Sequence, residues 1–348
     1  MQELKKDMPL LFTPFKIGEV EIKNRIVMPP MCMYKAKDDN GMPRCFHKLH
    51  YAARSLGGVG LIIVEATAVE PRGRITHNDL GLWSDEQIED HAKLVKDSSK
   101  YGAKMAIQLA HAGRKSTCDS EPIAPSALKF SDEYKTPKEM SLDDINLIKA
   151  KFVEAALRAQ KAGYDIIEIH AAHGYLISEF LSPGINKRSD KYGGSFENRT
   201  RLLKEILTEV KAAVDIPVGV RISAQSFVKD DWSLADSVKL AVELEKLGAA
   251  FIHVSSGGFF EKVDFMPRLV PLYQCSYAKA IKEAVNIPVI AVGLITTASE
   301  GEALLLGEVC DGVAYGRELL RNPNFAQLAM KELGVSELIE KPYRRAFN

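Results

Sequence analysis

Eight short apolar runs rich in β-branched residues recur along the 348-residue chain, and segments with helical periodicity separate them. The runs are RIVMP from Arg25, GLIIVEA from Gly60, KMAIQLA from Lys104, YDIIEIH from Tyr164, PVGVRIS from Pro217, AFIHVSS from Ala250, PVIAVG from Pro288 and DGVAYG from Asp311. Strands that alternate with helices pair in parallel. Eight such units predict a single closed (β/α)8 TIM barrel. An open doubly wound sheet is the alternative, although the turn after the first run has no G-x-G-x-x-G fingerprint.

No linker rich in Gly, Ser or Pro divides the chain, so residues 1–348 are predicted to form one domain. Three stretches do not fit the eight units and are expected to decorate the barrel. They are an N-terminal hairpin within FKIGEVEIKN and the loop insertions 118–137 and 182–199. Barrel enzymes build many of their sites from such insertions.

Charge and cysteine content exclude several classes of protein. Lys and Arg together number 46, as do Asp and Glu, and no basic block is long enough to bind nucleic acid. The five cysteines are widely spaced and include no C-x-x-C pair, which argues against zinc or iron–sulfur sites and favours the reducing cytoplasm. No segment reaches the roughly 18 apolar residues that a membrane span needs. We therefore expect a cytoplasmic protein with neither nucleic acid nor membrane as a partner.

Two histidines and a tyrosine follow the fourth run, in the stretch IHAAHGYL. In a barrel the active site lies at the carboxyl ends of the strands, so His170, His173 and Tyr175 are expected to converge there. Imidazole N–H groups can hold a developing oxyanion, and a phenol can deliver a proton to carbon. The alternative is that both histidines are satisfied within the core, His170 at the strand end and His173 on a backbone carbonyl.

A metal site is a further alternative, because His47 and His50 stand three residues apart on an expected helix. Together with His170 and His173 they would form a four-histidine site. No Asp or Cys spacing supports such a site, and no metal is expected.

Polar residues and glycines end several of the other runs. Gln108 follows the third, Arg221 interrupts the apolar fifth, and glycines after the seventh and eighth precede Arg317. Bare backbone N–H groups and an arginine at the last two strands often hold a phosphate. Together these residues indicate a ligand with a terminal phosphate and a flat polar ring whose reactive face lies beneath the two histidines. Flavin mononucleotide (FMN) meets each of these requirements.

Several longer fragments, taken together, resemble the old yellow enzymes, which are FMN-dependent ene-reductases. The fragments are NRIVMPPMCMY, IQLAHAGRKS, EIHAAHGYLISEFLSPGINKRSDKYGGSFENR and GRELLRNP, and the likeness runs from about Phe12 to the C-terminus. Cys32 indicates the thermophilic-like subclass, since other members of the family carry Thr there. The resemblance implies a ping-pong NAD(P)H oxidoreductase with tightly but non-covalently bound FMN, which reduces the C=C bond of α,β-unsaturated carbonyl compounds or similarly activated alkenes.

The resemblance also implies a role for each matching residue. His170 and His173 would hold the carbonyl oxygen of the substrate, and Tyr175, or solvent, would protonate its α-carbon. Cys32 would tune the redox potential of the flavin. The positions that match flavin contacts are Pro29, Met31, Cys32, Ala66, Gln108, Arg221, Gly293, Gly316 and Arg317.

The matching substrate-side positions are Tyr34, Lys115 and Arg345. The C-terminal YRRAF resembles a tail in which one arginine enters the active site of a neighbouring subunit, and its spacing favours Arg345 over Arg344. The tail from about residue 335 to 348 is therefore expected at a subunit interface of a homodimer or homotetramer.

Some positions depart from the family pattern. Pro29 stands where Ser is common and Phe227 where Tyr is expected, and the loop 256–274 has no counterpart in the resemblance. Three other functions stay open: an FMN-barrel reductase of tRNA uridine, a reductase of dienoyl thioesters, and a colourless phosphate-binding isomerase or aldolase. The balanced charge argues against the first, and the absence of iron–sulfur cysteines argues against the second.

Overall fold

The structure is a computed structural model, and it describes residues 8–347. Residues 1–7 and 348, which belong to the predicted domain, and in the last case to the predicted tail, lie outside the described residues.

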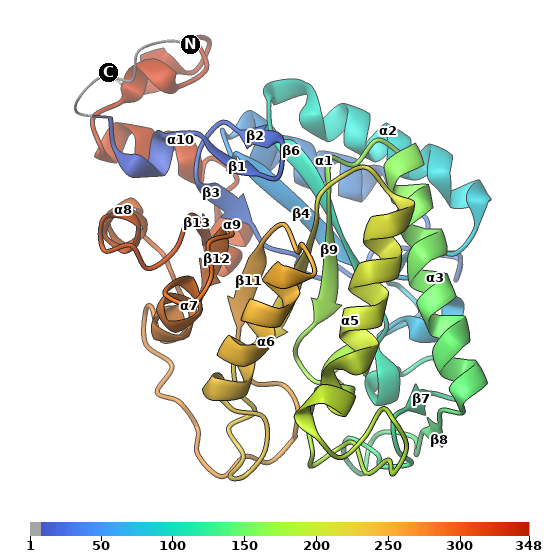
Figure 1. The fold of residues 1–348 in the computed structure, drawn as a ribbon. Coiled ribbons are helices and arrows are strands. Elements are labelled where there is room, and N and C mark those ends of the chain that lie inside the picture. Colours follow the sequence, from blue (N-terminus) through green and yellow to red (C-terminus); the bar gives the residue numbers. More distant parts are fainter. Residues whose placement is uncertain (1–7, 348) are drawn as a thin grey trace.

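Eight parallel strands close into a barrel, one for each of the eight predicted runs (Figure 1). In the sheet β3 is followed by β13, β12, β11, β10, β9, β6 and β4, and a pairing of β3 with β4 closes the circle. The predicted TIM barrel is thus confirmed. The strands are β3 (Ile26–Met28), β4 (Leu61–Ala68), β6 (Lys104–Ala110), β9 (Ile166–Ala171), β10 (Val218–Ser223), β11 (Ile252–Ser255), β12 (Val289–Val292) and β13 (Gly312–Ala314).

Helices cover the outside of the barrel and bury their apolar faces against the strands (Figure 1). The longest, α3, begins at Ser141, whose hydroxyl accepts from the Asp144 N–H at 3.1 Å while the Asp144 carboxylate accepts from the Ser141 N–H at 2.9 Å. The helices are α1 (Cys45–Leu56), α2 (Ile88–Ser98), α3 (Leu142–Lys161), α4 (Leu176–Leu181), α5 (Phe196–Ala213), α6 (Leu234–Lys246), α7 (Cys275–Lys282), α8 (Ala298–Leu306), α9 (Gly316–Arg321) and α10 (Phe325–Glu332).

The predicted N-terminal hairpin is present, formed by β1 (Phe15–Ile17) and β2 (Val20–Ile22). Ile17 and Ile22 are fully buried in an apolar cluster with Leu61 and other residues at the amino ends of the barrel strands. Burying these side chains removes apolar surface from water, and the hairpin thereby closes this end of the barrel.

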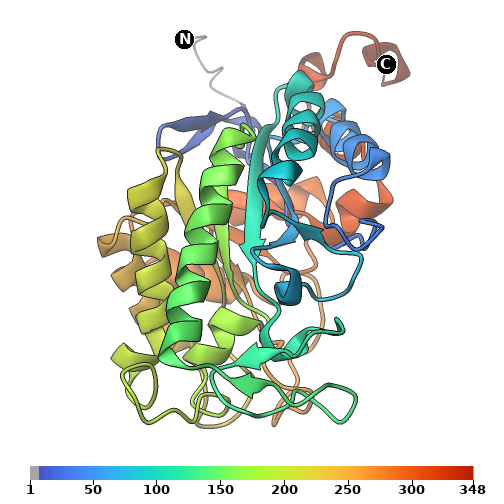
Figure 2. The same cartoon turned by 90° about the vertical axis from the view of Figure 1, so that its right-hand side faces the viewer.

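The loops that follow the strands gather at the opposite end of the barrel from the chain termini (Figure 2). The insertion 118–137 lies there and contains the short strand β7 (Ile123–Ala124), which pairs with β8 (Lys138–Glu139) directly after the insertion. A further short strand, β5 (Leu80–Gly81), pairs with the end of β4. These two-residue strands were not predicted, because they are too short to show a sequence period. Within residues 8–347, no helix combines the length and the apolar character required to cross a bilayer.

Candidate functional site

His170, His173 and Tyr175 converge at the carboxyl end of β9. The ring centroid of His170 lies 5.3 Å from that of His173 and 5.1 Å from that of Tyr175, both in edge-to-face geometry. The chain turns sharply here, since His173 has φ of +60° and Gly174 has φ of +70°. A Cβ at Gly174 would lie only 2.1 Å from the carbonyl oxygen of Gly258, so glycine lets the turn pack against the loop that follows β11.

Burial sets the protonation of this trio. It lowers the pKa of His170 and of His173 well below the usual range, and the nearby Arg221 guanidinium adds to the effect. Both imidazoles are therefore neutral at physiological pH. Burial also raises the pKa of Tyr175 well above its ordinary value, so that its hydroxyl keeps its proton. The site thus presents two neutral rings and a phenol that can donate.

Two hydrogen bonds orient the imidazoles. The Ala172 N–H donates to Nδ1 of His170 at 3.2 Å, which puts the proton of the neutral ring on Nε2. Nε2 of His173 lies 2.7 Å from the Ser255 hydroxyl, which is 3.4 Å from the Gln274 side-chain oxygen. The Ser255 hydroxyl has one proton, which it can give to the Gln274 oxygen or, over the shorter distance, to Nε2 of His173. Donation to Nε2 places the proton of neutral His173 on Nδ1, and in that tautomer each ring has one N–H for a substrate oxygen.

A layer of four polar side chains lies inside the barrel beside this trio. Gln108 donates to one Glu168 oxygen at 2.7 Å, and Nδ1 of His253 lies 2.7 Å from the other. Arg221 is paired in register with His253 on one side and with His170 on the other. The Glu168 carboxylate favours the charged form of Arg221, although burial lowers the pKa of the guanidinium.

Two nitrogens of this layer have no hydrogen-bond partner within residues 8–347. One is Nε of Arg221, a donor on a residue that is 7% exposed, and the other is Nε2 of His253, an acceptor because the proton of the neutral ring lies on Nδ1, toward Glu168. A buried guanidinium nitrogen is costly unless an acceptor meets it. The ring oxygens and nitrogens of a flavin are acceptors of the required kind, and Gln108 adds an amide that is 1% exposed.

A cavity of about 270 Å³ extends from Arg221 along the ends of β12, β13 and β3. Six of the nine predicted flavin contacts line it: Pro29, Met31, Arg221, Gly293, Gly316 and Arg317. Gly293 has φ of +144°, and a Cβ there would lie 2.9 Å from Gln274. The N–H groups of Gly316 and Arg317 open α9 and therefore lack partners within the helix. Glycines, free N–H groups and an exposed arginine suit the phosphate of FMN.

Cys32 and Tyr34 lie in the segment after β3, close to the strand residue Ala66. The Cys32 thiol faces the Tyr34 hydroxyl and the backbone of Ala66. Burial and the nearby Asp79 and Glu65 carboxylates raise the pKa of Cys32, so it remains a thiol at neutral pH. Burial also raises the pKa of Tyr34 to about 12. The predicted contacts Cys32, Tyr34 and Ala66 thus share one wall.

Lys115 stands beside the trio. Its ammonium donates to the carbonyl oxygens of His173 at 3.0 Å and Gly258 at 3.2 Å, and it lies 5.0 Å from the centre of the Tyr175 ring. Burial lowers the pKa of Lys115 to about 8. The structure therefore places this predicted residue against the catalytic candidates.

The loop 256–274, which the resemblance left undefined, borders the same mouth. Its Asp264 N–H donates to the Phe227 carbonyl at 3.0 Å, and the Phe265 ring meets the Phe227 ring edge-on at 5.7 Å. Phe227 has φ of +65°. The departure from tyrosine at this position thus places an apolar ring, without a hydroxyl, beneath the loop.

The C-terminal segment, which includes the short helix η7 (Arg344–Ala346), lies at the end of the barrel opposite to this mouth (Figure 2). Arg344 donates to the carbonyl oxygen of Ile339 at 2.7 Å and is tied to the tail itself. Arg345 is exposed and has no hydrogen bond within residues 8–347. The structure does not bring Arg345 to the site of its own chain.

The four-histidine metal site is not formed. His47 and His50 lie on α1, where burial lowers the pKa of His47 to about 4 and that of His50 to about 3. His47 accepts from the Arg44 N–H, and the ring of His50 stacks on Phe46. No group of three or more metal-ligating side chains occurs in the part of the chain that the structure describes.

Sequence reasoning gave no role to Glu168, His253 or Ser255. Glu168 lies two residues before His170, on the same face of β9, but its partners come from other strands. His253 interrupts the apolar run AFIHVSS as Arg221 interrupts VGVRIS, and this shared signal could have identified it. Ser255 carried no signal, because a serine at a strand end is common.

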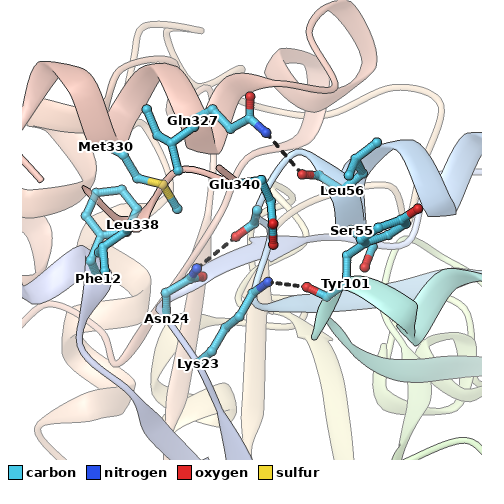
Figure 3. Close-up of a pocket in the computed structure, with 12 residues that line it drawn as sticks. Phe12, Lys23, Asn24, Ser55, Leu56, Tyr101, Gln327, Met330, Leu338 and Glu340 are labelled. Atoms are coloured by element: carbon cyan, nitrogen blue, oxygen red, sulfur yellow. Dashed lines mark hydrogen bonds between the residues drawn. The ribbon is translucent and has the colours of Figure 1, made fainter. Parts of the chain in front are cut away.

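A second cavity, of about 310 Å³, lies at the amino ends of β3, β4 and β6, beneath the C-terminal tail (Figure 3). Lys23 donates to the Tyr101 carbonyl at 2.7 Å, Asn24 to the Gly58 carbonyl at 2.8 Å, and Gln327 to the Leu56 carbonyl at 3.1 Å. These donors therefore already have partners in the protein. Figure 3 shows the dashed bonds that link them to the backbone.

Comparisons with known proteins agree with this geometry. A profile of the NADH:flavin oxidoreductase / NADH oxidase family matches residues 10–335. The NADPH dehydrogenase of Geobacillus sp. (strain WCH70) is 48% identical over 338 residues, which are 97% of this chain and 98% of that protein. The NADPH dehydrogenase of Bacillus subtilis (strain 168) is 47% identical over 337 residues, 97% of this chain and 99% of that protein. The solved structure of morphinone reductase superposes with a TM-score of 0.81 at 29% identity, over 95% of this chain and 91% of that one.

Proposed function

This chain belongs to the NADH:flavin oxidoreductase / NADH oxidase family, and from that premise we propose that it is an FMN-dependent ene-reductase. Its substrates are α,β-unsaturated carbonyl compounds or similarly activated alkenes, and NADPH or NADH is the reductant. The observation that carries the proposal is the convergence of two neutral imidazoles and a protonated phenol next to the flavin cavity.

Each residue of the trio has a part in the reaction. Nε2–H of His170 and an N–H of His173 bind the carbonyl oxygen and stabilise the negative charge that develops on it. A bound FMN would supply the hydride chemistry at the β-carbon of the alkene, with NAD(P)H as the reductant. Tyr175 gives its proton to the α-carbon, which its raised pKa permits, since the hydroxyl is not ionised at neutral pH.

The cofactor contacts divide between the ring and the phosphate. Arg221 and Gln108 would hold the polar edge of the ring, and Ala66 and Cys32 would also contact the ring. Gly293, Gly316 and Arg317 would hold the phosphate, and Pro29 and Met31 line the same cavity. Their supporting observations are the unpartnered Nε of Arg221 and the shared cavity.

Tyr34 and Lys115 border the substrate. Lys115 is held by two backbone carbonyls and not by a carboxylate, so its charge remains available to a substrate oxygen or to the reductant.

Arg345 completes the site of a neighbouring subunit in a homodimer or in a tetramer of such dimers. Its exposure at the end of the tail supports this role. The protein is proposed to work in the cytoplasm, where its five free cysteines stay reduced.

The other functions are not favoured. The relatives that match 97% of the chain are NADPH dehydrogenases. No feature of the site calls for tRNA uridine or a dienoyl thioester as the substrate. An isomerase or aldolase would leave the unpartnered Arg221 nitrogen beside a flat ring site without a purpose.

An anaerobic absorption experiment tests the proposal. The purified protein should show the visible flavin bands, lose them on addition of NADPH or NADH, and regain them on addition of 2-cyclohexenone. A protein that takes up no FMN would refute the flavin reading. A flavoprotein that is reduced by NAD(P)H but is not reoxidised by any enone would refute the substrate class.

A further inference from the structure

Glu65 is a buried carboxylate that has no part in the reaction described above. It lies on β4, directly before the flavin-wall residue Ala66, and is 1% exposed. One of its oxygens accepts from the Met33 N–H at 2.7 Å, and the other accepts from the Tyr51 hydroxyl at 3.1 Å. The Tyr51 hydroxyl in turn accepts from the Glu65 N–H at 3.0 Å. The carboxylate thus connects α1, β4 and the segment that follows β3.

The segment 31–34 needs such a support. It belongs to no helix or strand, and Tyr34 has φ of +53°, in the left-handed region that non-glycine residues rarely adopt. Such backbone persists only where surrounding contacts hold it. The Met33 N–H bond to Glu65 is one of these contacts, and the Tyr34 N–H also faces the same carboxylate. The side chains on either side of Met33 are Cys32 and Tyr34.

We propose that Glu65 is a positioning residue, whose carboxylate holds segment 31–34 against β4 and thereby sets where Cys32 and Tyr34 stand in the site. The proposal rests on the proposed function only in assigning Cys32 and Tyr34 to the flavin and substrate walls. The hydrogen bond from the Met33 N–H to Glu65 does not depend on which cofactor or substrate the protein binds.

The surroundings of Glu65 make the strength of its hydrogen bond to the Met33 N–H depend on pH. Among the described residues, the one basic side chain within ion-pair distance is His47, 3.6 Å away, which is neutral because burial lowers its pKa. The other groups that face Glu65 are the hydroxyl of Tyr51 on α1, the Cys32 thiol and Tyr34 phenol of the segment, Asp79 and Tyr164.

Burial, with a smaller contribution from Asp79, raises the pKa of Glu65 to about 7. The ionised carboxylate is the stronger acceptor, so the segment is held more firmly above pH 7 than below it.

Hydrogen exchange followed by mass spectrometry tests the proposal in the purified holoenzyme and in protein freed of flavin. In Glu65→Gln, the protection factor of peptides covering 31–34 should fall about tenfold at pH 8.5, while the barrel strands keep theirs. The protection of the same peptides should rise with pH through about 7 in the parent protein and stay level in the variant. Tyr51→Phe, which keeps the carboxylate, should give a smaller loss.

Glu179→Gln is the matched control. Glu179 is also fully buried, and it accepts from the Arg114 N–H at 2.8 Å, but it supports a different loop. Its substitution should loosen residues near Arg114 and leave 31–34 protected. In turnover with 2-cyclohexenone, Glu65→Gln should raise KM several-fold with a smaller change in kcat, because Tyr34 borders the substrate.

Two results would overturn the role of Glu65. One is a Glu65→Gln protein whose segment 31–34 exchanges as slowly as in the parent, and the other is a loss of protection that spreads evenly over the barrel. Neither result bears on whether the protein is a flavoenzyme. A parent protein that binds no FMN and reduces no enone would instead refute the proposed function, and the exchange data would still report on Glu65.

Discussion

The two ends of the barrel treat their buried polar groups differently. At the amino end, the buried amides of Asn24 and Gln327 line a cavity of about 310 Å³ and donate to backbone carbonyls nearby, and the Ser55 hydroxyl is the one buried side-chain polar atom of this lining without a partner among the described residues. At the carboxyl end, nitrogens of Arg221 and His253 have no partner within residues 8–347. A buried charge is costlier to leave unpaired than a hydroxyl, so the unpartnered guanidinium nitrogen is the stronger mark of a place where a ligand completes the structure. The two cavities are similar in size, so volume does not distinguish them. Whether the polar atoms of the lining have hydrogen-bond partners is the better guide to the active site.

Backbone strain is concentrated at the carboxyl end, although Glu308, which precedes β13 at the amino end, also has positive φ. Tyr34, His173, Phe227 and Leu294 all have positive φ, and each comes shortly after a barrel strand, at its carboxyl end. Non-glycine residues in this region cost of order 1 kcal/mol or more and persist where packing over-determines them. The carboxyl end thus holds strained turns that aim side chains, whereas the amino end is closed by a regular hairpin.

The largest expected effect is at the histidine pair. Replacing His170 or His173 by Ala should lower the rate of enone reduction about 10²-fold or more, because each removes an oxyanion donor. FMN content and the rate of reduction by NADPH should change little. Rapid-mixing absorption measurements separate the two half-reactions, and an unchanged enone rate in both variants would remove the pair from the mechanism.

The next effect concerns flavin affinity. Arg221→Ala should weaken FMN binding by about 10- to 10²-fold, because a buried charged hydrogen bond is lost and Glu168 loses its nearby positive charge. Arg221→Lys, which keeps the charge but not the planar fork, should lie between the parent and the alanine variant. Titration of the apoprotein with FMN measures the affinity. Equal affinity in all three proteins would mean that Arg221 does not face the cofactor.

A smaller effect is the pH dependence of stability set by Glu179 at the carboxyl end. Burial raises the pKa of Glu179 from 4.5 to about 8, so between these values the folded protein binds a proton that the unfolded chain has lost. The free energy of unfolding therefore falls as pH rises through this window. In Glu179→Gln the fall between pH 5 and 8.5 should be smaller by roughly 4 kcal/mol, at about 1.4 kcal/mol for each pH unit.

Urea unfolding at the two pH values measures the difference. Glu19→Gln, at a side chain that is 99% exposed, is the control and should leave the slope of stability against pH as it is. A parent protein and a Glu179→Gln variant with parallel pH profiles would contradict the raised pKa.

The smallest effect is at the amino end. Asn24→Ala should lower the free energy of unfolding by about 1 kcal/mol, since it removes the bond to the Gly58 carbonyl. The ratio kcat/KM for an enone should not change, because Asn24 lies at the opposite end of the barrel from His170, His173 and Tyr175. A large loss of activity at unchanged stability would show that the amino end also takes part in catalysis.

Much of this protein was predictable from local patterns. The eight apolar runs and the helical segments between them specify the barrel, because period and strand–helix alternation are short-range properties. The barrel then assigns the site to the strand ends, which singled out His170, His173 and Tyr175 before any coordinates. Gln108, Arg221 and the glycines after the last two strands followed from the same rule.

Only the tertiary structure decided how these residues are held. The layer of Gln108, Glu168 and His253 joins side chains from three strands, with Glu168 and His253 85 positions apart in sequence, and no period relates them. The protonation of the trio, of Lys115 and of Glu65 depends on burial, which is created when distant segments pack together. The link from Glu65 to Met33 likewise exists only because β4 closes the barrel beside β3. Sequence patterns specify which side chains reach the mouth, and long-range packing determines their charge and orientation there.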